Sequence, residues 1–261
     1  MAYTTIDFVV ENGVAKIILN RPEKLNSFSD EMHREIRDIM PILKKDDVRC
    51  ILITGAGRAF GAGADLSADS MSADGEFDAG ETLQKDYNPL ITFIRNLDKP
   101  VICAVNGIAA GASMSLALAA DIVLAAKSAS FLQAFCHIGL VPDAGSTFFL
   151  PRLAGMGKAM GLAMLGDKIP AEEAERMGLI WKVYPDEELM PAAESLAARM
   201  AAGPTKGYGL IKKAMNASLE NNLQEQLDIE RDLQREAGRT EDFAEGVSAF
   251  FGKRKAQFKG R

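Results

Sequence analysis

Asp143 is the residue whose surroundings point most directly to acid–base chemistry. An apolar run over residues 131–141 ends at Pro142, Asp143 follows, and turn residues at 145–147 precede a second apolar run. A carboxylate placed between two hydrophobic stretches can take up and return a proton if a ligand reaches it. Aspartate after proline also commonly begins a helix as its N-cap. The local sequence leaves both interpretations open.

Two glycine-rich loops could supply main-chain N–H groups to the same site. Residues 61–65 (GAGAD) and 106–113 (NGIAAGAS) each follow a predicted buried strand, and the second loop leads into a helix N-terminus, which carries positive potential. Two such donors aimed at one point would stabilise a carbonyl oxygen that becomes an enolate. Neither loop matches the Walker or dinucleotide patterns. Tight turns that allow close strand–helix packing are the alternative interpretation of both loops.

Composition argues against several other functions. The chain has 261 residues, a net charge of −6 and a pI near 5.2, so no basic field favours nucleic acid or an anionic membrane. Two histidines leave little material for a metal centre or a Ser-His-Asp triad. The three cysteines lie in apolar runs, which predicts reduced core thiols, and no apolar run has the length of a membrane span. The N-terminus does not resemble a signal peptide, so we expect a cytoplasmic protein.

Alternation of strands, loops and helices predicts an α/β fold with helices packed on parallel strands. An Asn-Gly turn predicts a hairpin over residues 6–19, and buried strands are expected at 50–54, 100–105, 121–125 and 179–184. Helices are expected at residues 29–45, 81–96, 109–120 and 218–236. The acidic segment 67–80, rich in Ser, Ala and Gly, is the expected flap over the site.

Four ordered motifs resemble those of the crotonase superfamily, which contains the acyl-CoA hydratases and isomerases. They are residues 20–26 (NRPEKLN), 59–66 (AFGAGADL), 99–107 (KPVICAVNG) and 139–147 (GLVPDAGST), and the closing residues 250–258 (FFGKRKAQF) match as well. The resemblance implies a spiral of ββα units over residues 1–195 that holds an acyl-CoA site. It also implies a helical region over 196–261 that builds a homotrimer, or a dimer of trimers. The family acts on coenzyme A thioesters and uses no metal or redox cofactor.

The resemblance also assigns roles to individual residues. The oxyanion donors fall on the N–H groups of Ala64 and Ala112. Residues around the coenzyme A moiety fall on Lys24, Leu25, Ala62 and Asp65, with Phe250 and Lys253 contributed by a neighbouring subunit. A lysine near a coenzyme A phosphate would suit the basic C-terminal tail, for which a solvated charged terminus is the alternative interpretation. The aromatic residues expected to line the acyl pocket are Phe60, Tyr87, Phe135 and Phe148.

The sequence departs from the hydratases of that family at two positions. Those enzymes use two glutamates to hold and activate water, and the corresponding positions here are Ser115 and Phe135. A hydroxyl and a phenyl ring cannot replace two carboxylates in this role, so we expect weak hydration or none. Asp143 lies where the isomerases of the family have a carboxylate, and it could act as both base and acid. Apolar neighbours such as Phe135, Ile138 and Val141 would raise its pKa.

The expected function is therefore acyl-CoA isomerisation. Residues 21–33 (RPEKLNSFSDEMH), 87–90 (YNPL) and 228–235 (DIERDLQR) resemble the branch that isomerises 1,2-epoxyphenylacetyl-CoA to the oxepin and moves Δ3 double bonds to Δ2. Three alternatives are kept: an enoyl-CoA hydratase, an aryl-CoA dehalogenase and a non-catalytic scaffold or RNA-binding relative. The dehalogenase would need a histidine and a tryptophan where this chain has Asn88 and Phe135. The acidic pI argues against RNA binding.

Overall fold

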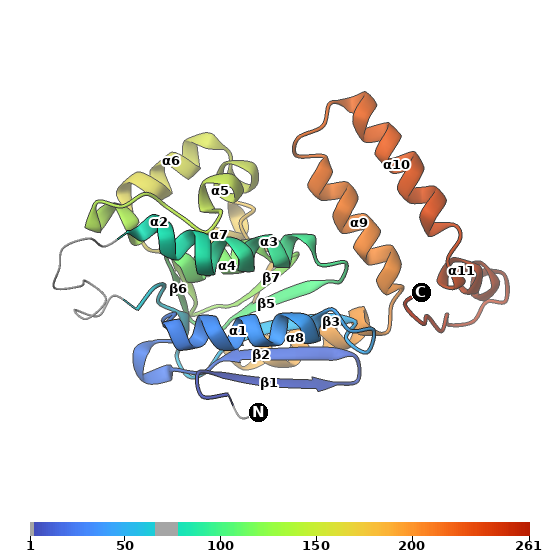
Figure 1. Cartoon of the computed structure of the whole chain (residues 1–261), viewed down its shortest axis with the longest axis horizontal. Helices are drawn as coiled ribbons and strands as arrows, with labels where there is room; N and C mark the ends of the chain where they lie inside the picture. Colours follow the sequence, from blue (N-terminus) through green and yellow to red (C-terminus); the bar gives the residue numbers. More distant parts are fainter. Residues whose placement is uncertain (1–2, 66–77) are drawn as a thin grey trace.

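Two β-sheets form the core of the chain, for which a computed structural model describes residues 3–65 and 78–261 (Figure 1). The larger sheet has the strand order β1-β2-β3-β5-β7-β10, and the smaller has the order β4-β6-β8-β9. The strands of the larger sheet are β1 Ile6–Glu11, β2 Val14–Leu19, β3 Cys50–Gly55, β5 Val101–Val105, β7 Ile122–Ala126 and β10 Lys182–Tyr184. Those of the smaller sheet are β4 Ala59–Gly61, β6 Ile108–Ala110, β8 Ser130–Leu132 and β9 Ile169–Pro170.

Successive strand pairs alternate between the two sheets. In each of the pairs β3/β4, β5/β6 and β7/β8, the first strand enters the larger sheet and the second enters the smaller one. The strands pair in parallel with their counterparts from the next unit. Burial of both faces explains why β3 and β5 are continuous apolar runs with every residue buried. The expected α/β spiral of ββα units is confirmed.

Thirteen named helical segments accompany the sheets in the described residues, besides the short 3₁₀ turn η1 Pro22–Lys24. They are α1 Asp30–Leu43, α2 Ala79–Thr82, the π-helical η3 Leu83–Tyr87, α3 Asn88–Asn96, α4 Ala112–Ala119, the 3₁₀ helix η4 Ala134–Ile138, α5 Ser146–Ala154, α6 Met156–Leu165, α7 Ala171–Arg176, α8 Asp186–Ala201, α9 Thr205–Ala217, α10 Leu223–Ala237 and α11 Glu241–Phe251. Within these residues no helix is long and apolar enough to cross a membrane.

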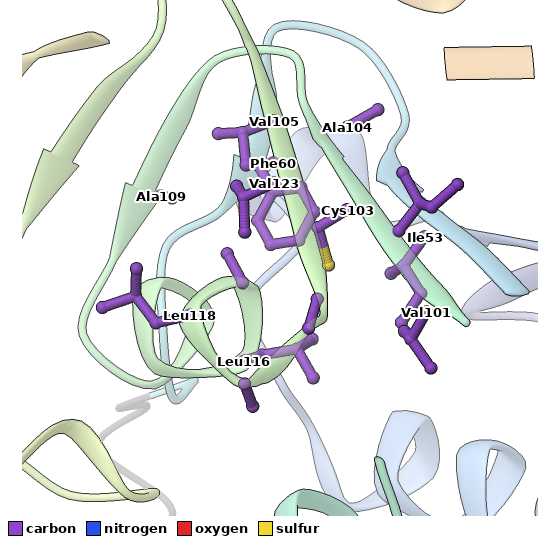
Figure 2. Close-up of a cluster of buried hydrophobic side chains, with 14 of the residues drawn as sticks. Ile53, Phe60, Val101, Cys103, Ala104, Val105, Ala109, Leu116, Leu118 and Val123 are labelled. Carbon is purple, nitrogen blue, oxygen red and sulfur yellow. The ribbon is translucent and has the colours of Figure 1, made fainter. Parts of the chain in front are cut away.

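Helix α4 lies in the core because its side chains are small or apolar all round. All eight of its residues are buried. Figure 2 shows Leu116 and Leu118 of this helix beside the buried strand residues Cys103 and Val123. A helix without a polar face cannot lie on a surface, so it is enclosed by other elements. This burial fixes the N-terminal end of α4, where the second glycine-rich loop ends.

The expected N-terminal hairpin and the start of the first helix are confirmed. β1 pairs antiparallel with β2 through the Asn12-Gly13 turn, and the side chain of Ser29 caps α1 by accepting from the Met32 N–H. The helix expected over 81–96 is present, but π-helical geometry interrupts it over Leu83–Tyr87. The helix expected from residue 218 begins at Leu223, because Asn222 and Glu225 form a capping box there.

Helices α9–α11 extend away from the sheets as an arm (Figure 1). Its base is fixed by Lys212, whose ammonium group lies 2.8 Å from the Asp121 carboxylate. The boundary expected at residues 195/196 falls inside α8, which packs on the larger sheet through the buried Ala193 and Ala197. The buried stripe of α8 continues to Ala201, and the change of direction comes at residues 202–204, while the division into two domains stays a prediction.

Two of the three cysteines are core thiols as expected. Cys50 and Cys103 are fully buried and free, and burial raises the pKa of Cys50 to about 12. The expectation for Cys136 was wrong, since this residue lies on η4 and is only partly buried. Of the apolar residues in the 3₁₀ helix η4, Phe135 is buried, whereas Cys136 lies partly at the surface.

Glu35 joins α1 to the N-terminal segment. Its two carboxylate oxygens accept the main-chain N–H groups of Thr4, Thr5 and Ile6 and both threonine hydroxyls. Burial would raise the pKa of Glu35, but the hydrogen bonds from Thr5 and Thr4 outweigh it and hold the pKa at about 2. The ionised form of Glu35 therefore stabilises the fold.

We predict that Glu35→Gln lowers the free energy of unfolding by about 1–3 kcal/mol at neutral pH, because an amide cannot accept this set of donors. The folded-state pKa lies below the ordinary value of 4.5. The stabilisation is therefore complete above about pH 4.5 and is lost as the pH falls toward about 2. Urea unfolding over a range of pH should show wild type and variant converging in acid. The exposed Glu175→Gln is the control, and a difference independent of pH would contradict the prediction.

Candidate active site

A tight turn carries Asp143 between η4 and α5. The carbonyl oxygen of Asp143 accepts the Ser146 N–H at 2.9 Å, and both central residues of the turn have positive φ, 48° at Ala144 and 84° at Gly145. Two positive φ values are typical of a type I′ turn, and a non-glycine residue in this region is strained. The Gly145 position leaves no room for a side chain, because a Cβ would lie 2.7 Å from the Phe149 ring.

Asp143 does not cap a helix. Helix α5 has Gly145 as its N-cap and receives no side-chain cap. Instead, the Asp143 Oδ1 atom is buried without a hydrogen-bond partner among the described residues. Burial of this carboxylate raises its pKa from the ordinary value of 3.8 to about 6. Asp143 is thus held as a base whose pKa is close to neutrality, and the N-cap interpretation was wrong.

The groups around Asp143 differ in part from those expected. Ile138 and Val141 are 57% and 76% exposed, so their expected contribution to burying the carboxylate was wrong. Ile138 is the last residue of the 3₁₀ helix η4 and Val141 lies after its end, and both side chains are at the surface. Tyr87 lies on the inner side, and its pKa is raised by burial and then by the negative charge of Asp143. The Asp143 and Tyr87 side chains are therefore within electrostatic range of each other.

Tyr87 is held in an aromatic cluster below the site. Its ring centroid lies 4.5 Å from that of His33 and 5.6 Å from that of Phe28. Burial lowers the pKa of His33 to about 4, so His33 stays neutral. The adjacent Asp86 forms an ion pair with Arg37 of α1. These contacts fix the end of η3 relative to α1 and leave little freedom to the Tyr87 ring.

The two glycine-rich loops lie against each other. A Cβ on Gly63 would be 3.1 Å from the Ala110 carbonyl oxygen and 3.6 Å from the Ala112 nitrogen, which shows how closely the two backbones approach. Gly63 is the residue before Ala64, so the structure brings the Ala64 and Ala112 peptides side by side. The Ser113 hydroxyl oxygen adds a link, because it accepts the Gly63 N–H at 3.0 Å.

The N–H groups of Ala64 and Ala112 have no hydrogen-bond partner within residues 3–65 and 78–261. Ala64 forms a parallel bridge with Phe28 in which Phe28 donates to the Gly63 carbonyl and accepts from Asp65, so the Ala64 N–H points away from Phe28. Ala112 is the first residue of α4, where N–H groups have no acceptor within the helix. Two free N–H donors, one from each glycine-rich loop, thus lie side by side.

A buried chain of polar side chains lies behind these donors. Gln133 donates from Nε2 to the Ser146 hydroxyl at 2.9 Å, Ser146 is hydrogen-bonded to Ser115, and Ser115 donates to the Gly111 carbonyl at 3.2 Å. Reasoning from the sequence assigned no role to Gln133 or Ser146. A single glutamine within the apolar run 131–138 was the available signal, since an unpaired buried amide is costly.

The expected coenzyme A residues are only partly brought together. The Ala62 N–H donates to the Leu25 carbonyl at 2.9 Å, so these two residues meet, and Lys24 is exposed at the end of η1. Asp65 forms an ion pair with Arg21 at 2.8 Å. The Arg21–Asp65 pair joins the loop after β2 to the first glycine-rich loop. Binding of coenzyme A by these residues stays a prediction.

Phe250 and Lys253 lie elsewhere in this chain. Both are exposed on or just after α11, which lies beside the C-terminus (Figure 1). Their expected role depends on a neighbouring subunit and stays a prediction. Most of the expected flap over 67–80 lies outside the described residues, and Asp78 at its end caps α2.

The four aromatic residues expected in the acyl pocket have different surroundings. Phe135 is buried, and its ring lies against Gly111, 3.6 Å from the position of a Cβ there. Tyr87 is buried and lies within electrostatic range of Asp143. Phe60 is fully buried among core residues such as Val105 and Val123 (Figure 2), and its assignment to the pocket stays a prediction. Phe148 is partly buried under the Arg152 guanidinium group, which lies 3.7 Å from the ring centroid.

The described residues contain no group of three or more His, Cys, Asp or Glu side chains that could hold a metal ion. The candidate site therefore combines one carboxylate of raised pKa, two free N–H groups in adjacent peptides, and the aromatic rings of Phe135 and Tyr87. Such a set can hold a carbonyl oxygen and move a proton nearby.

Comparison with known proteins gives consistent results. The family model "Enoyl-CoA hydratase/isomerase" matches residues 9–261. The chain is 52% identical over 254 residues, 97% of each chain, to the "1,2-epoxyphenylacetyl-CoA isomerase" of Escherichia coli (strain K12). It is 46% identical over the full length of both chains to a "Probable enoyl-CoA hydratase" of Rhodobacter capsulatus. The crystal structure of an enoyl-CoA hydratase from Bacillus anthracis superposes with a TM-score of 0.92 at 32% identity, over 99% of this chain and 100% of that one.

We predict that Gly145→Ala displaces the Asp143 turn. The new Cβ would meet the Phe149 ring, and alanine would have to adopt a φ of 84°, which residues with a side chain rarely do. We expect a loss of about 2–4 kcal/mol in unfolding free energy, measured by chemical denaturation. Gly139→Ala is the matched control, because Gly139 also has positive φ, 72°, but open space around it, so about 1–2 kcal/mol is expected there. Equal losses in the two variants would contradict the crowded turn.

Proposed function

The chain belongs to the enoyl-CoA hydratase/isomerase family of the crotonase superfamily and is an enzyme of acyl-CoA chemistry, and from this premise we propose that it is an isomerase with Asp143 as its single proton shuttle. The substrates proposed are 1,2-epoxyphenylacetyl-CoA, converted to the oxepin, and Δ3 enoyl-CoA esters, converted to Δ2 esters. The observation that carries the proposal is the buried, unpartnered carboxylate oxygen of Asp143.

In the proposed reaction the N–H groups of Ala64 and Ala112 bind the thioester oxygen. For a Δ3 ester, Asp143 takes a proton from Cα, and the electron pair of that C–H bond moves onto the thioester oxygen, which becomes an enolate. The two donors stabilise the negative charge that develops there. Asp143 then returns the proton to C4, and the double bond moves into conjugation with the thioester. One carboxyl group thus serves as base and then as acid.

Two side chains support isomerisation over hydration. Hydration needs groups that hold and activate water, and the two positions concerned are Ser115 and Phe135. The Ser115 hydroxyl is fully buried and engaged with Ser146 and the Gly111 carbonyl, and Phe135 places an apolar ring beside Gly111. Neither can act as a general base near neutral pH. Enoyl-CoA hydration is therefore the alternative function, and the assay of wild type and Asp143→Asn on crotonyl-CoA distinguishes it from isomerisation.

The cofactor requirement, the oligomeric state and the location of the enzyme are proposed on the same basis. A proton shift needs no electron carrier, so we infer that coenzyme A, as part of the substrate, is the group that must be bound, with no metal or redox cofactor. The exposed apolar side chains of α9–α11, among them Ile211, Leu223, Leu227, Phe243 and Phe250, support assembly into a homotrimer or a dimer of trimers. We propose a cytoplasmic enzyme that binds neither nucleic acid nor membrane.

We predict that Asp143→Asn loses about two to four orders of magnitude in isomerase kcat, since an amide cannot accept the proton. Wild type and variant should be assayed on 1,2-epoxyphenylacetyl-CoA, 3-hexenoyl-CoA and crotonyl-CoA, with the exposed Asp167→Asn as control. Isomerisation by the wild type and little hydration of crotonyl-CoA are expected. Strong hydration by either form would overturn the proposed mechanism.

The pKa of Asp143 predicts the pH dependence of the reaction. Burial raises this pKa to about 6, and only the ionised carboxylate can take a proton. We expect kcat/KM to be constant above about pH 6 and to fall about tenfold per pH unit below it. A profile of kcat/KM between about pH 4.5 and pH 8 checks this. A profile without inflection in that range would count against Asp143 as the base.

A further inference from the structure

Three buried side chains outside the proposed chemistry lead to the Gly111–Ala112 peptide. Gln133 is 2% exposed, and Ser115 and Ser146 are 0% exposed. They come from three segments: Gln133 follows β8, Ser146 begins α5 and Ser115 lies on α4. Their polar atoms form an unbroken series from the Gln133 amide to the Gly111 carbonyl oxygen. Polar groups so deep in a protein are expected to serve a defined purpose.

The hydrogen bonds in this series can all run in one direction, toward the Gly111 carbonyl oxygen. The Ser115 hydroxyl donates to the Gly111 carbonyl, so its oxygen can accept from the Ser146 hydroxyl. The Ser146 oxygen then accepts from Gln133 Nε2. Each group donates toward Gly111, and bonds aligned in this way polarise one another. The Gln133 Oε1 atom is left without a partner in the described residues.

The series ends on the peptide unit that carries one of the two free donors. The Gly111 carbonyl oxygen accepts both the Ser115 N–H at 3.1 Å and the Ser115 hydroxyl at 3.2 Å. The N–H at the other end of that peptide belongs to Ala112. Hydrogen bonds to a carbonyl oxygen withdraw electron density from its amide, which makes the N–H a stronger donor.

Ser146 connects this peptide to the turn that carries the carboxylate. Its main-chain N–H donates to the Asp143 carbonyl at 2.9 Å, while its hydroxyl bonds to Ser115. The same residue therefore touches both halves of the site. A shift of α5 relative to α4 would alter both contacts together.

We propose that Gln133, Ser146 and Ser115 are positioning residues that fix and polarise the Ala112 N–H and set its place relative to Asp143. The proposal rests on the proposed function, because it assumes that the Ala112 N–H binds the thioester oxygen. We call these three hydrogen-bonded side chains the relay. The relay acts on the negative charge that grows on the thioester oxygen during the reaction, so breaking the relay should lower kcat more than it raises KM.

The test uses Ser115→Ala, Gln133→Met and the double variant in the full-length enzyme. Ser115→Ala is expected to lower kcat about tenfold and to change KM less than about threefold. Gln133→Met, at the far end of the relay, is expected to lower kcat about threefold. The double variant should match Ser115→Ala alone, because the relay is already broken there. Ser130→Ala is the matched control, a buried serine of β8 outside the relay, and should leave kcat unchanged.

A spectroscopic measurement separates positioning from general stability. Phenylacetyl-CoA labelled with carbon-13 at the thioester carbonyl reports the strength of the donors through its infrared stretching band. The band should move to lower frequency on binding to the wild type, and less so in Ser115→Ala and Gln133→Met. Melting temperatures identify any variant that fails to fold, and Gln133→Met then carries the test if Ser115→Ala does not fold.

The outcomes distinguish the relay from the proposed function. The relay proposal would be overturned if the carbonyl band shifted as far in both relay variants as in the wild type. It would also be overturned if the kcat losses of the two single variants multiplied in the double variant. Asp143→Asn should lower kcat by about two to four orders of magnitude and keep the wild-type band. If Asp143→Asn stays active while the relay variants still weaken the band shift, the proton-shuttle mechanism fails and the relay stands.

Discussion

The close approach of two main-chain segments is the contact on which the site depends. Gly63 lies against the peptide that joins Gly111 to Ala112; a Cβ on residue 63 would make a tight 3.1 Å contact with the Ala110 carbonyl oxygen, at a φ of 91° that side chains rarely adopt. This approach occurs where the smaller sheet passes from β4 to β6, so it is created by the stacking of successive strand pairs. The buried α4 holds one side of the contact, and the Phe28–Ala64 bridge holds the other. The two free N–H groups follow from this packing.

Two carboxylates in this chain show how surroundings decide chemical character. Glu35 and Asp143 are both acids held by the fold. Glu35 receives several hydrogen bonds, which hold its pKa at about 2, so it is a permanent anion with a structural role. Asp143 has one oxygen without a donor, and burial raises its pKa to about 6. Only the second environment lets a carboxyl group exchange a proton near neutral pH.

Local patterns in the sequence predicted a large part of the fold. The hairpin turn at Asn12-Gly13, the cap at Ser29 and the apolar runs of β3 and β5 depend on near neighbours in the chain, and all were confirmed. The expectation that Ile138 and Val141 help to bury Asp143 was wrong, because hydrophobicity alone does not say which apolar residues enter the core and which stay exposed. The order of motifs singled out Asp143 and the two glycine-rich loops. The link from Gln133 through Ser146 to Ser115 joins segments distant in sequence, so it required the structure.

The use of main-chain groups as donors has a consequence for the evolution of such a site. An N–H group belongs to the backbone, so exchange of a side chain at position 64 or 112 leaves the donor in place, and only proline would remove it. The side chains at 115, 135 and 143 can be exchanged without removing either donor. A scaffold of this kind can keep its hold on one chemical group of a substrate while mutation explores different reactions beside it. The serine, phenylalanine and aspartate found at these positions are then one solution among several that the same backbone permits.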